Sequence, residues 1–129
     1  MRSWIWLDER DALAVHDRSL VLHGGAAGVR DAGLMASALA RPRQLEAYGE
    51  NVDVVDLAAA YTAGLVQNHP FVDGNKRTGF VVGILFLELN GARFTASEEA
   101  ATQAVLGLAA GTLDDAGYAV FLRENISRE

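Results

Sequence analysis

The sequence predicts an all-α protein, a single compact bundle of about six helices. Half of the 129 residues are hydrophobic and alanine is abundant, a composition that favours a folded, helical chain over a disordered one. Apolar residues recur at helical spacing in several segments, and almost no segment has the pattern of a strand. A chain of this length is expected to form one domain, residues 1–129.

The N-terminal part predicts one longer and one short helix. Residues 8–22 carry apolar positions among charged ones, and the glycine pair at 24–25 should end this helix. A second helix should begin after Asp31 and stop near Pro42, because proline disfavours continuation of a helix. We therefore expect residues 41–52 to form a loop or a small hairpin.

Two apolar helices follow. Residues 53–68 have apolar side chains at three- and four-residue spacing, and Pro70 disfavours helical geometry in the residue before it. Residues 75–89 contain the stretch FVVGILFLEL, which is apolar all round and predicts a buried central helix. Within it Gly79 and Gly83 share a face, where they would either admit another helix closely or merely weaken this one.

Residues 97–110 and 114–123 predict the last two helices, the first capped by Ser97. No period of about 20 to 50 residues recurs, which excludes a repeat array.

Composition also excludes several functions. The formal net charge of −6 argues against direct binding of nucleic acid, which depends on clustered Lys and Arg. The absence of cysteine excludes disulfides and thiolate metal sites. The N-terminal apolar run is too short for a signal peptide, and no segment reaches the roughly 18 apolar residues of a membrane span. We therefore expect a cytoplasmic protein that does not bind membranes.

Polar side chains are concentrated in NHPFVDGNKRTG, residues 68–79, between the two apolar helices. The first backbone N–H groups of the second helix lack partners within it, and together with the helix dipole they attract anions. Gly74 lets a ligand approach the backbone and Asn75 offers an amide. Lys76 supplies a mobile cation, and Arg77 supplies a planar fork that matches phosphate oxygens. These residues predict a phosphate-binding site.

Two neighbouring side chains could carry out chemistry on a bound phosphate. The Asp73 carboxylate can hold Mg²⁺, which proteins usually bind through one or two carboxylates together with substrate phosphates. The His69 imidazole can accept a proton from an attacking hydroxyl group. A base, a metal ligand and a phosphate site within nine residues indicate phosphoryl or nucleotidyl transfer.

Each of these residues also has a structural interpretation. Asp73 could be a helix N-cap, and His69 could interact with the C-terminal dipole of the preceding helix. Lys76 and Arg77 could be a solvated first turn, and Phe71 is expected to pack in the core. The conjunction of these residue types favours the functional interpretation, as does the presence of Lys76 as the only lysine beside ten arginines.

Other motifs do not fit. Residues 74–79 have the spacing of the glycines in a P-loop, but Phe80 and Val81 stand where Lys and Ser or Thr are required. The three histidines lack the H-E-x-x-H arrangement of zinc proteases. We interpret His16 and His23 as ordinary helix residues.

HPFVDGNKR, residues 69–77, resembles the H-x-F-x-[D/E]-G-N-[G/K]-R signature of the Fic/Doc family at every specified position. The flanking segments GGAAGVRDAGLMASALARPRQ and FLELNGARF are similar to death-on-curing proteins of that family, so the resemblance covers most of residues 10–95. It implies an all-helical bundle in which the motif loop precedes the central helix.

The resemblance also implies a role for each motif residue. His69 would be the base that acts on a target hydroxyl, Asp73 would hold Mg²⁺, and Phe71 would anchor the loop in the core. ATP would be the co-substrate. Its phosphates would be contacted by Gly74, Asn75, Lys76 and Arg77.

Lys76 bears on the reaction type. In the family that this sequence resembles, Fic proteins that transfer AMP generally have glycine at the position of Lys76. Death-on-curing toxins have lysine, and are taken to bind ATP in the reversed sense and to transfer its γ-phosphate to elongation factor Tu. The resemblance thus implies a toxin kinase that arrests translation. Gly74, which some death-on-curing members replace with alanine, keeps AMP transfer as an alternative, and a catalytically silent binding module is a third.

The resemblance implies a protein partner as well. Many Fic proteins restrain themselves with an [S/T]-x-x-x-E-[G/N] helix, but here Val120 precedes Glu124 where Ser or Thr is required. Inhibition by a separate Phd-like antitoxin segment that folds on binding is therefore expected. Residues 41–52 would correspond to a flap that aligns the target backbone.

Overall fold

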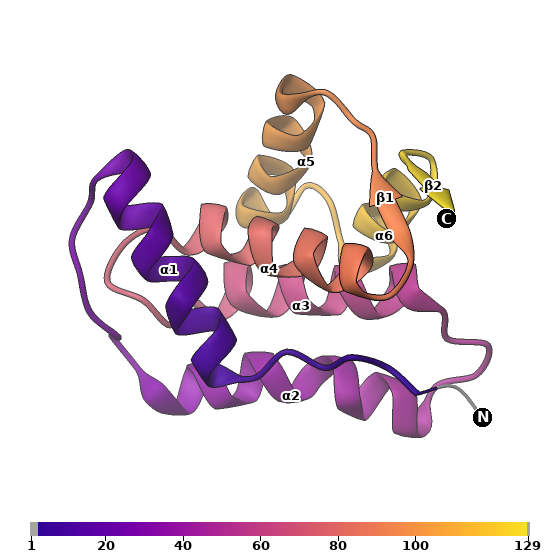
Figure 1. The fold of residues 1–129 in the computed structure, drawn as a ribbon, viewed down its shortest axis with the longest axis horizontal. Coiled ribbons are helices and arrows are strands. Elements are labelled where there is room, and N and C mark those ends of the chain that lie inside the picture. Colours follow the sequence, from indigo (N-terminus) through magenta and orange to yellow (C-terminus); the bar gives the residue numbers. More distant parts are fainter. Residues whose placement is uncertain (1–2, 129) are drawn as a thin grey trace.

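Six helices and a two-stranded sheet make up residues 3–128, the part of the chain that the structure, a computed structural model, describes (Figure 1). The predicted all-α class and helix number are confirmed for these residues. No helix among them combines the length and apolar character needed to cross a membrane. The helices are α1 (Glu9–His23), α2 (Ala32–Tyr48), α3 (Val54–Asn68), α4 (Asn75–Leu89), α5 (Glu98–Ala110) and α6 (Asp115–Arg123). The strands β1 (Ala92–Phe94) and β2 (Ile126–Arg128) pair antiparallel.

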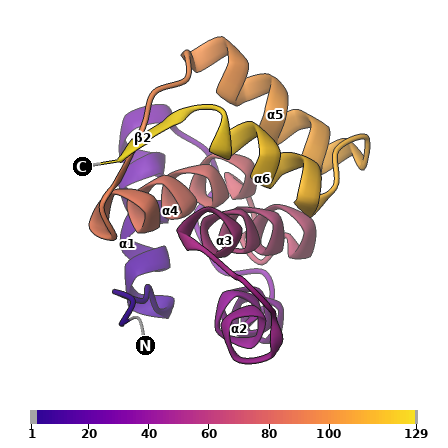
Figure 2. The ribbon, with the colours of Figure 1, turned by 90° about the vertical axis from the view of Figure 1, so that its right-hand side faces the viewer.

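The core is centred on α3, in which every residue from Val54 to Val66 except Asp56 is buried. Figure 2 looks nearly along α2 and α3, and shows α2 on one side of α3 and α6 on the other. α4 lies beside α3, and α1 crosses α4 (Figures 1 and 2). The most extensively buried of the six described helices thus leads directly into the motif loop.

Glycines bring α4 unusually close to α3. A Cβ atom on Gly83 would overlap Thr62 Oγ1 and lie 3.0 Å from the carbonyl oxygen of Ala58. One on Gly79 would lie 3.0 Å from Val66 Cγ2. Thr62 Oγ1 donates a hydrogen bond of 2.8 Å to the Gly79 carbonyl across this contact. Close helix packing, the first of the two interpretations of these glycines, is therefore confirmed.

The prediction of a loop or hairpin over residues 41–52 was wrong for residues 41–48, which are helical, and only residues 49–52 are irregular. α2 continues through the buried Pro42 to Tyr48, and Gly49 is its C-cap. Proline removes the hydrogen bond that the Ala38 carbonyl would otherwise accept within the helix. This carbonyl lies against Gly64 of α3, where an added Cβ would be only 3.0 Å from it. Burial of α2 against α3 outweighs the roughly 3 kcal/mol that an internal proline costs.

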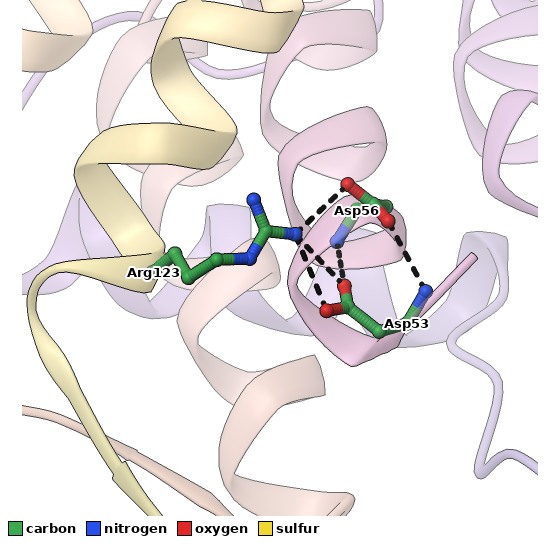
Figure 3. Close-up of polar contacts among 3 residues, drawn as sticks. All are labelled: Asp53, Asp56 and Arg123. Atoms are coloured by element: carbon green, nitrogen blue, oxygen red, sulfur yellow. Dashed lines mark hydrogen bonds and ion pairs between the residues drawn. The ribbon is translucent and has the colours of Figure 1, made fainter. Parts of the chain in front are cut away.

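An arginine joins the end of α6 to the start of α3 (Figure 3). Asp53 caps α3 in a reciprocal arrangement with Asp56, and Arg123 Nη2 donates to both carboxylates at 3.1 Å. Desolvation raises the pKa of Asp53, but the Asp56 backbone N–H and the Arg123 charge outweigh it, so this pKa is lowered.

The N-terminal segment is held by two side chains of the central helices. The buried Tyr61 hydroxyl accepts a hydrogen bond from the Leu7 N–H at 2.9 Å and donates one to the Leu7 carbonyl at 3.0 Å. The Asn90 side chain likewise bonds both backbone groups of Ile5. The segment thereby gains strand-like hydrogen bonding without a neighbouring strand.

Candidate active site

The motif loop forms one end of a cleft of about 670 Å³ between α4 and α5. This volume suits a small-molecule ligand, whose sites usually span about 300 to 1,000 Å³. Six of the predicted residues line it: His69, Asp73, Gly74, Asn75, Lys76 and Arg77. The rest of the lining combines the apolar side chains of Phe80, Val81, Phe94, Ala101, Val105 and Leu106 with polar ones such as Ser97, Glu98 and Thr102.

Phe71 and Asn75 fix the inner side of the loop. Phe71 is completely buried, as expected. Asn75 Oδ1 accepts from the Phe71 N–H at 2.8 Å, and Asn75 Nδ2 donates to the Phe71 carbonyl at 3.0 Å. Because the Asn75 amide is engaged in these bonds, the group that Asn75 can present to a ligand is its backbone N–H.

The first turn of α4 is open to a ligand. Its N-cap is Gly74, with φ 78° and ψ 19°, a left-handed conformation that glycine adopts easily. No side chain of the described residues caps this end of the helix. The unpaired N–H groups and the helix dipole therefore remain available for an anion. Lys76 and Arg77 are both exposed, and neither forms an ion pair among residues 3–128.

The Asp73 carboxylate is held by two backbone groups, and it is not the N-cap of α4. Oδ2 accepts from the Ala26 N–H at 3.2 Å, and Oδ1 accepts from the Gly74 N–H at 2.9 Å. These bonds lower the pKa of Asp73, desolvation opposes them, and charge interactions with His16 and Lys76 lower the pKa further. Asp73 is therefore an ionised, exposed carboxylate with a fixed orientation.

The residues present fit a magnesium ion that arrives with a nucleotide. Among residues 3–128 no cluster of three or more His, Cys, Asp or Glu side chains could hold a metal ion by itself. Mg²⁺ does not require such a cluster, because one carboxylate can suffice when phosphate oxygens and water complete its shell. Each Asp73 oxygen accepts one of these hydrogen bonds and keeps acceptor capacity for a cation.

His69 ends α3 in a left-handed conformation, with φ 55° and ψ 53°. This backbone region is uncommon for residues other than glycine. Arg30 holds it by donating from Nε to the His69 carbonyl at 2.8 Å and from Nη2 to the Asn68 carbonyl at 3.1 Å. The imidazole is exposed at the cleft and has no hydrogen bond within the described residues, so it is available to a substrate.

The α1–α2 connection (residues 24–31) supports the loop from beneath, which was not predicted from the sequence. The N–H groups of Arg30 and Asp31 donate to the Pro70 carbonyl at 2.7 and 3.1 Å, and the Val72 N–H donates to the Gly28 carbonyl at 3.0 Å. Glycines 24, 25 and 28 all have positive φ. Their clustering was the available sequence signal of a tightly packed connection.

The interpretation of His16 as an ordinary helix residue was also wrong. Its side chain is 2% exposed, Nε2 lies 2.8 Å from the Asp73 carbonyl oxygen, and its ring stacks on Phe71. It is therefore part of the loop's support rather than an ordinary helix residue. His23, by contrast, is exposed and lines the cleft.

The sequence is similar to those of known proteins over most of its length. The model of the Fic/DOC family matches residues 6–87. The chain is 32% identical over 117 residues to "Protein kinase doc" of Escherichia phage P1, covering 91% of this chain and 92% of that protein. It is 40% identical over 93 residues to "Toxin Doc" of Mycolicibacterium smegmatis, covering 70% of this chain and 68% of that protein. A chain with this cleft, this motif and these relatives belongs to the Fic/DOC family.

Proposed function

We propose that the protein is a kinase that transfers the γ-phosphate of ATP to a Ser or Thr hydroxyl of another protein. The observation that carries the proposal is the convergence on one cleft of an exposed imidazole, an ionised carboxylate and an uncapped helix N-terminus. The first two are His69 and Asp73. The relative named as a protein kinase supports the same reaction.

In the proposed reaction the backbone N–H groups of the first turn of α4 and the Arg77 guanidinium bind the ATP phosphates. Mg²⁺ bound at Asp73 would neutralise phosphate charge. His69 accepts the proton of the target hydroxyl, whose oxygen bonds to the γ-phosphorus. The bond from that phosphorus to the β–γ bridging oxygen breaks, and ADP leaves.

We further propose that the protein acts as a toxin on a translation factor in the cytoplasm, with elongation factor Tu as the first target to test. The relative named "Toxin Doc" supports this. A Phd-like antitoxin would be the partner that restrains it.

AMP transfer is the second candidate function. Gly74 favours it, because glycine is the residue of the general Fic pattern at this position. The two reactions break different bonds of ATP, so the position of a radioactive label distinguishes them.

The test is incubation with elongation factor Tu and ATP labelled at either the α- or the γ-phosphate. We expect the target to become labelled with γ-labelled ATP and not with α-labelled ATP. Labelling by α-labelled ATP would establish AMP transfer instead. The control is His69→Ala, which removes an exposed side chain and should abolish transfer without changing the melting temperature. Undiminished growth inhibition by this variant would instead indicate a silent binding module.

A further inference from the structure

His16 is a buried titratable residue that the proposed reaction does not use. It lies in the middle of α1, and its side chain reaches the underside of the motif loop. Nε2 is 2.8 Å from the Asp73 carbonyl oxygen, which can only accept, so this nitrogen carries the hydrogen. The imidazole ring lies parallel to Phe71, with the ring centroids 3.9 Å apart and an interplanar angle of 6°.

One peptide group connects His16 to the Asp73 carboxylate. The carbonyl of the peptide between Asp73 and Gly74 accepts the His16 hydrogen bond. The N–H of the same peptide donates to Asp73 Oδ1 at 2.9 Å. Since a peptide group is planar, fixing its carbonyl also fixes the direction of its N–H. The orientation of Oδ1 therefore depends on the bond from His16.

The other carboxylate oxygen is fixed from the α1–α2 connection. Ala26 donates its N–H to Oδ2 at 3.2 Å. Gly25 comes so close that a Cβ on it would lie 2.8 Å from the same oxygen. Oδ2 is thus held directly by a residue that precedes the motif by more than forty residues, and Oδ1 is held by Gly74 within the motif, whose peptide group His16 fixes.

We propose that His16 is a positioning residue. It holds the Asp73–Gly74 peptide group so that the Asp73 carboxylate faces the divalent cation that accompanies the ATP phosphates. The inference rests on the proposed function, because it requires a nucleotide and a cation at this cleft. His16 touches no reacting atom, so it acts on cation binding and leaves proton transfer to His69.

Two substitutions separate this role from simple packing. His16→Phe keeps an aromatic ring against Phe71 but removes the donor. His16→Gln keeps an N–H donor at comparable reach but removes the ring. If His16 only fills space, the phenylalanine variant should resemble the wild type more closely than the glutamine variant does.

The measurement is the dissociation constant of Mn²⁺ in the presence of a non-hydrolysable ATP analogue, followed by electron paramagnetic resonance. Mn²⁺ suits the carboxylate and water ligands that also bind Mg²⁺. His16→Phe should weaken Mn²⁺ binding about tenfold or more, the usual effect of removing a hydrogen bond that orients a metal ligand. His16→Gln should stay close to the wild type, even where thermal unfolding shows it to be less stable.

Arg30→Met is the matched control, because it loosens the other end of the loop while leaving the Asp73–Gly74 peptide group in contact with His16. It should leave Mn²⁺ affinity near the wild-type value. Equal weakening by Arg30→Met and His16→Phe would overturn the inference in favour of general loosening, as would a glutamine variant weaker than the phenylalanine variant.

Failure of the inference and failure of the proposed function give different results. If the wild type binds the Mn²⁺–nucleotide complex and the variants do not differ as described, only the role of His16 is wrong. If the wild type binds no such complex, the proposed function and the inference fail together.

Discussion

At the residue scale, Lys76 is the side chain on which the choice between phosphate and AMP transfer is expected to depend. It is exposed at the second position of α4 and lines the cleft. Lys76→Gly should shift the product on the target protein from phosphate towards AMP, because it removes bulk and charge beside the bound phosphates. Mass spectrometry of the modified target measures the ratio. A variant that still adds only phosphate would show that Lys76 does not determine the reaction.

Gly25 provides a second prediction at this scale. Gly25→Ala should lower the free energy of unfolding by about 1–3 kcal/mol, the usual cost of a strained backbone position, since its φ is +117°. It should also weaken Mn²⁺ binding, because the new Cβ would displace Asp73 Oδ2.

Gly24→Ala is the control for this prediction. Gly24 has φ +76°, but a Cβ there would meet no atom within 4 Å. In urea denaturation, Gly24→Ala should lower the free energy of unfolding about as much as Gly25→Ala does. It should bind Mn²⁺ with the affinity of the wild type. Equal Mn²⁺ affinity in the two variants would contradict the predicted displacement of Asp73.

Residue types predicted from the sequence which residues lie at the candidate site, but not the direction of each side chain. All six predicted ligand and catalytic residues lie at the cleft. The Asn75 side-chain amide, however, forms hydrogen bonds with the Phe71 backbone instead of pointing to a ligand. The position of Asn75 in the sequence does not distinguish these two possibilities. His16 is 57 residues from Asp73, and only the crossing of α1 over α4 brings them together.

At the element scale, the packing of α3 against α4 predicts an inverted response to alanine. Alanine normally stabilises a helix by about 1 kcal/mol relative to glycine. Gly83→Ala should instead destabilise the protein, because the new Cβ would overlap Thr62 Oγ1, and overpacking a core costs about 1–3 kcal/mol. Urea denaturation measures the change. An increase in stability would show that the two helices can separate without cost.

The connection between α3 and α6 predicts a pH-dependent effect. Arg123→Met should lower the free energy of unfolding at neutral pH by about 1 kcal/mol or less, since solvent screens this partly exposed pair. The folded-state pKa of Asp53 is lowered, so the stabilisation is complete above the ordinary value of 3.8 and is lost as pH falls through the lowered value. Denaturation curves of wild type and variant should therefore converge in acid. A difference that persists there would indicate lost packing of the arginine instead.

Helix boundaries were predictable wherever a cap marked them. Asp53, Ser97 and Asp114 each accept a hydrogen bond from a first-turn N–H, and all three helices begin directly after them. α2 extended beyond its predicted end because the cost of Pro42 is local, whereas the burial that outweighs it depends on Gly64 of another helix.

At the scale of the whole molecule, the Tyr61 hydroxyl group is one of the two side-chain groups that hold the N-terminal segment. Tyr61→Phe should lower the free energy of unfolding by about 1–3 kcal/mol, because it leaves the buried N–H and carbonyl of Leu7 without their partner. Trp4 and Trp6, the only tryptophans, both contact Phe86, so tryptophan fluorescence in urea follows this segment directly.

The control for the hydroxyl is Tyr48→Phe, in a side chain that is 87% exposed. It should leave the fluorescence midpoint unchanged. A Tyr61→Phe protein with the same midpoint as the wild type would mean that water replaces the tyrosine oxygen.

The fold class followed from composition and helical spacing because a helix is specified by near neighbours in the sequence. The path of residues 3–8 could not be predicted in this way, because it is set by distant residues: Tyr61 in α3 and Asn90, the C-cap of α4. The pairing of β1 with β2 escaped prediction for the same reason, because each strand has only three residues and its partner lies at the other end of the C-terminal region.

The hydrogen bonds that hold the motif loop from outside end almost entirely on its main chain. Arg30 binds the carbonyls of Asn68 and His69, the connection binds Pro70 and Val72 through their backbones, and His16 binds the Asp73 carbonyl. Beyond Phe71 and Asn75, which fix its inner side, the loop therefore owes little of its shape to the exposed side chains that it displays. Replacing exposed groups such as Lys76 should therefore change what the cleft offers to a ligand while the backbone beneath them keeps its path.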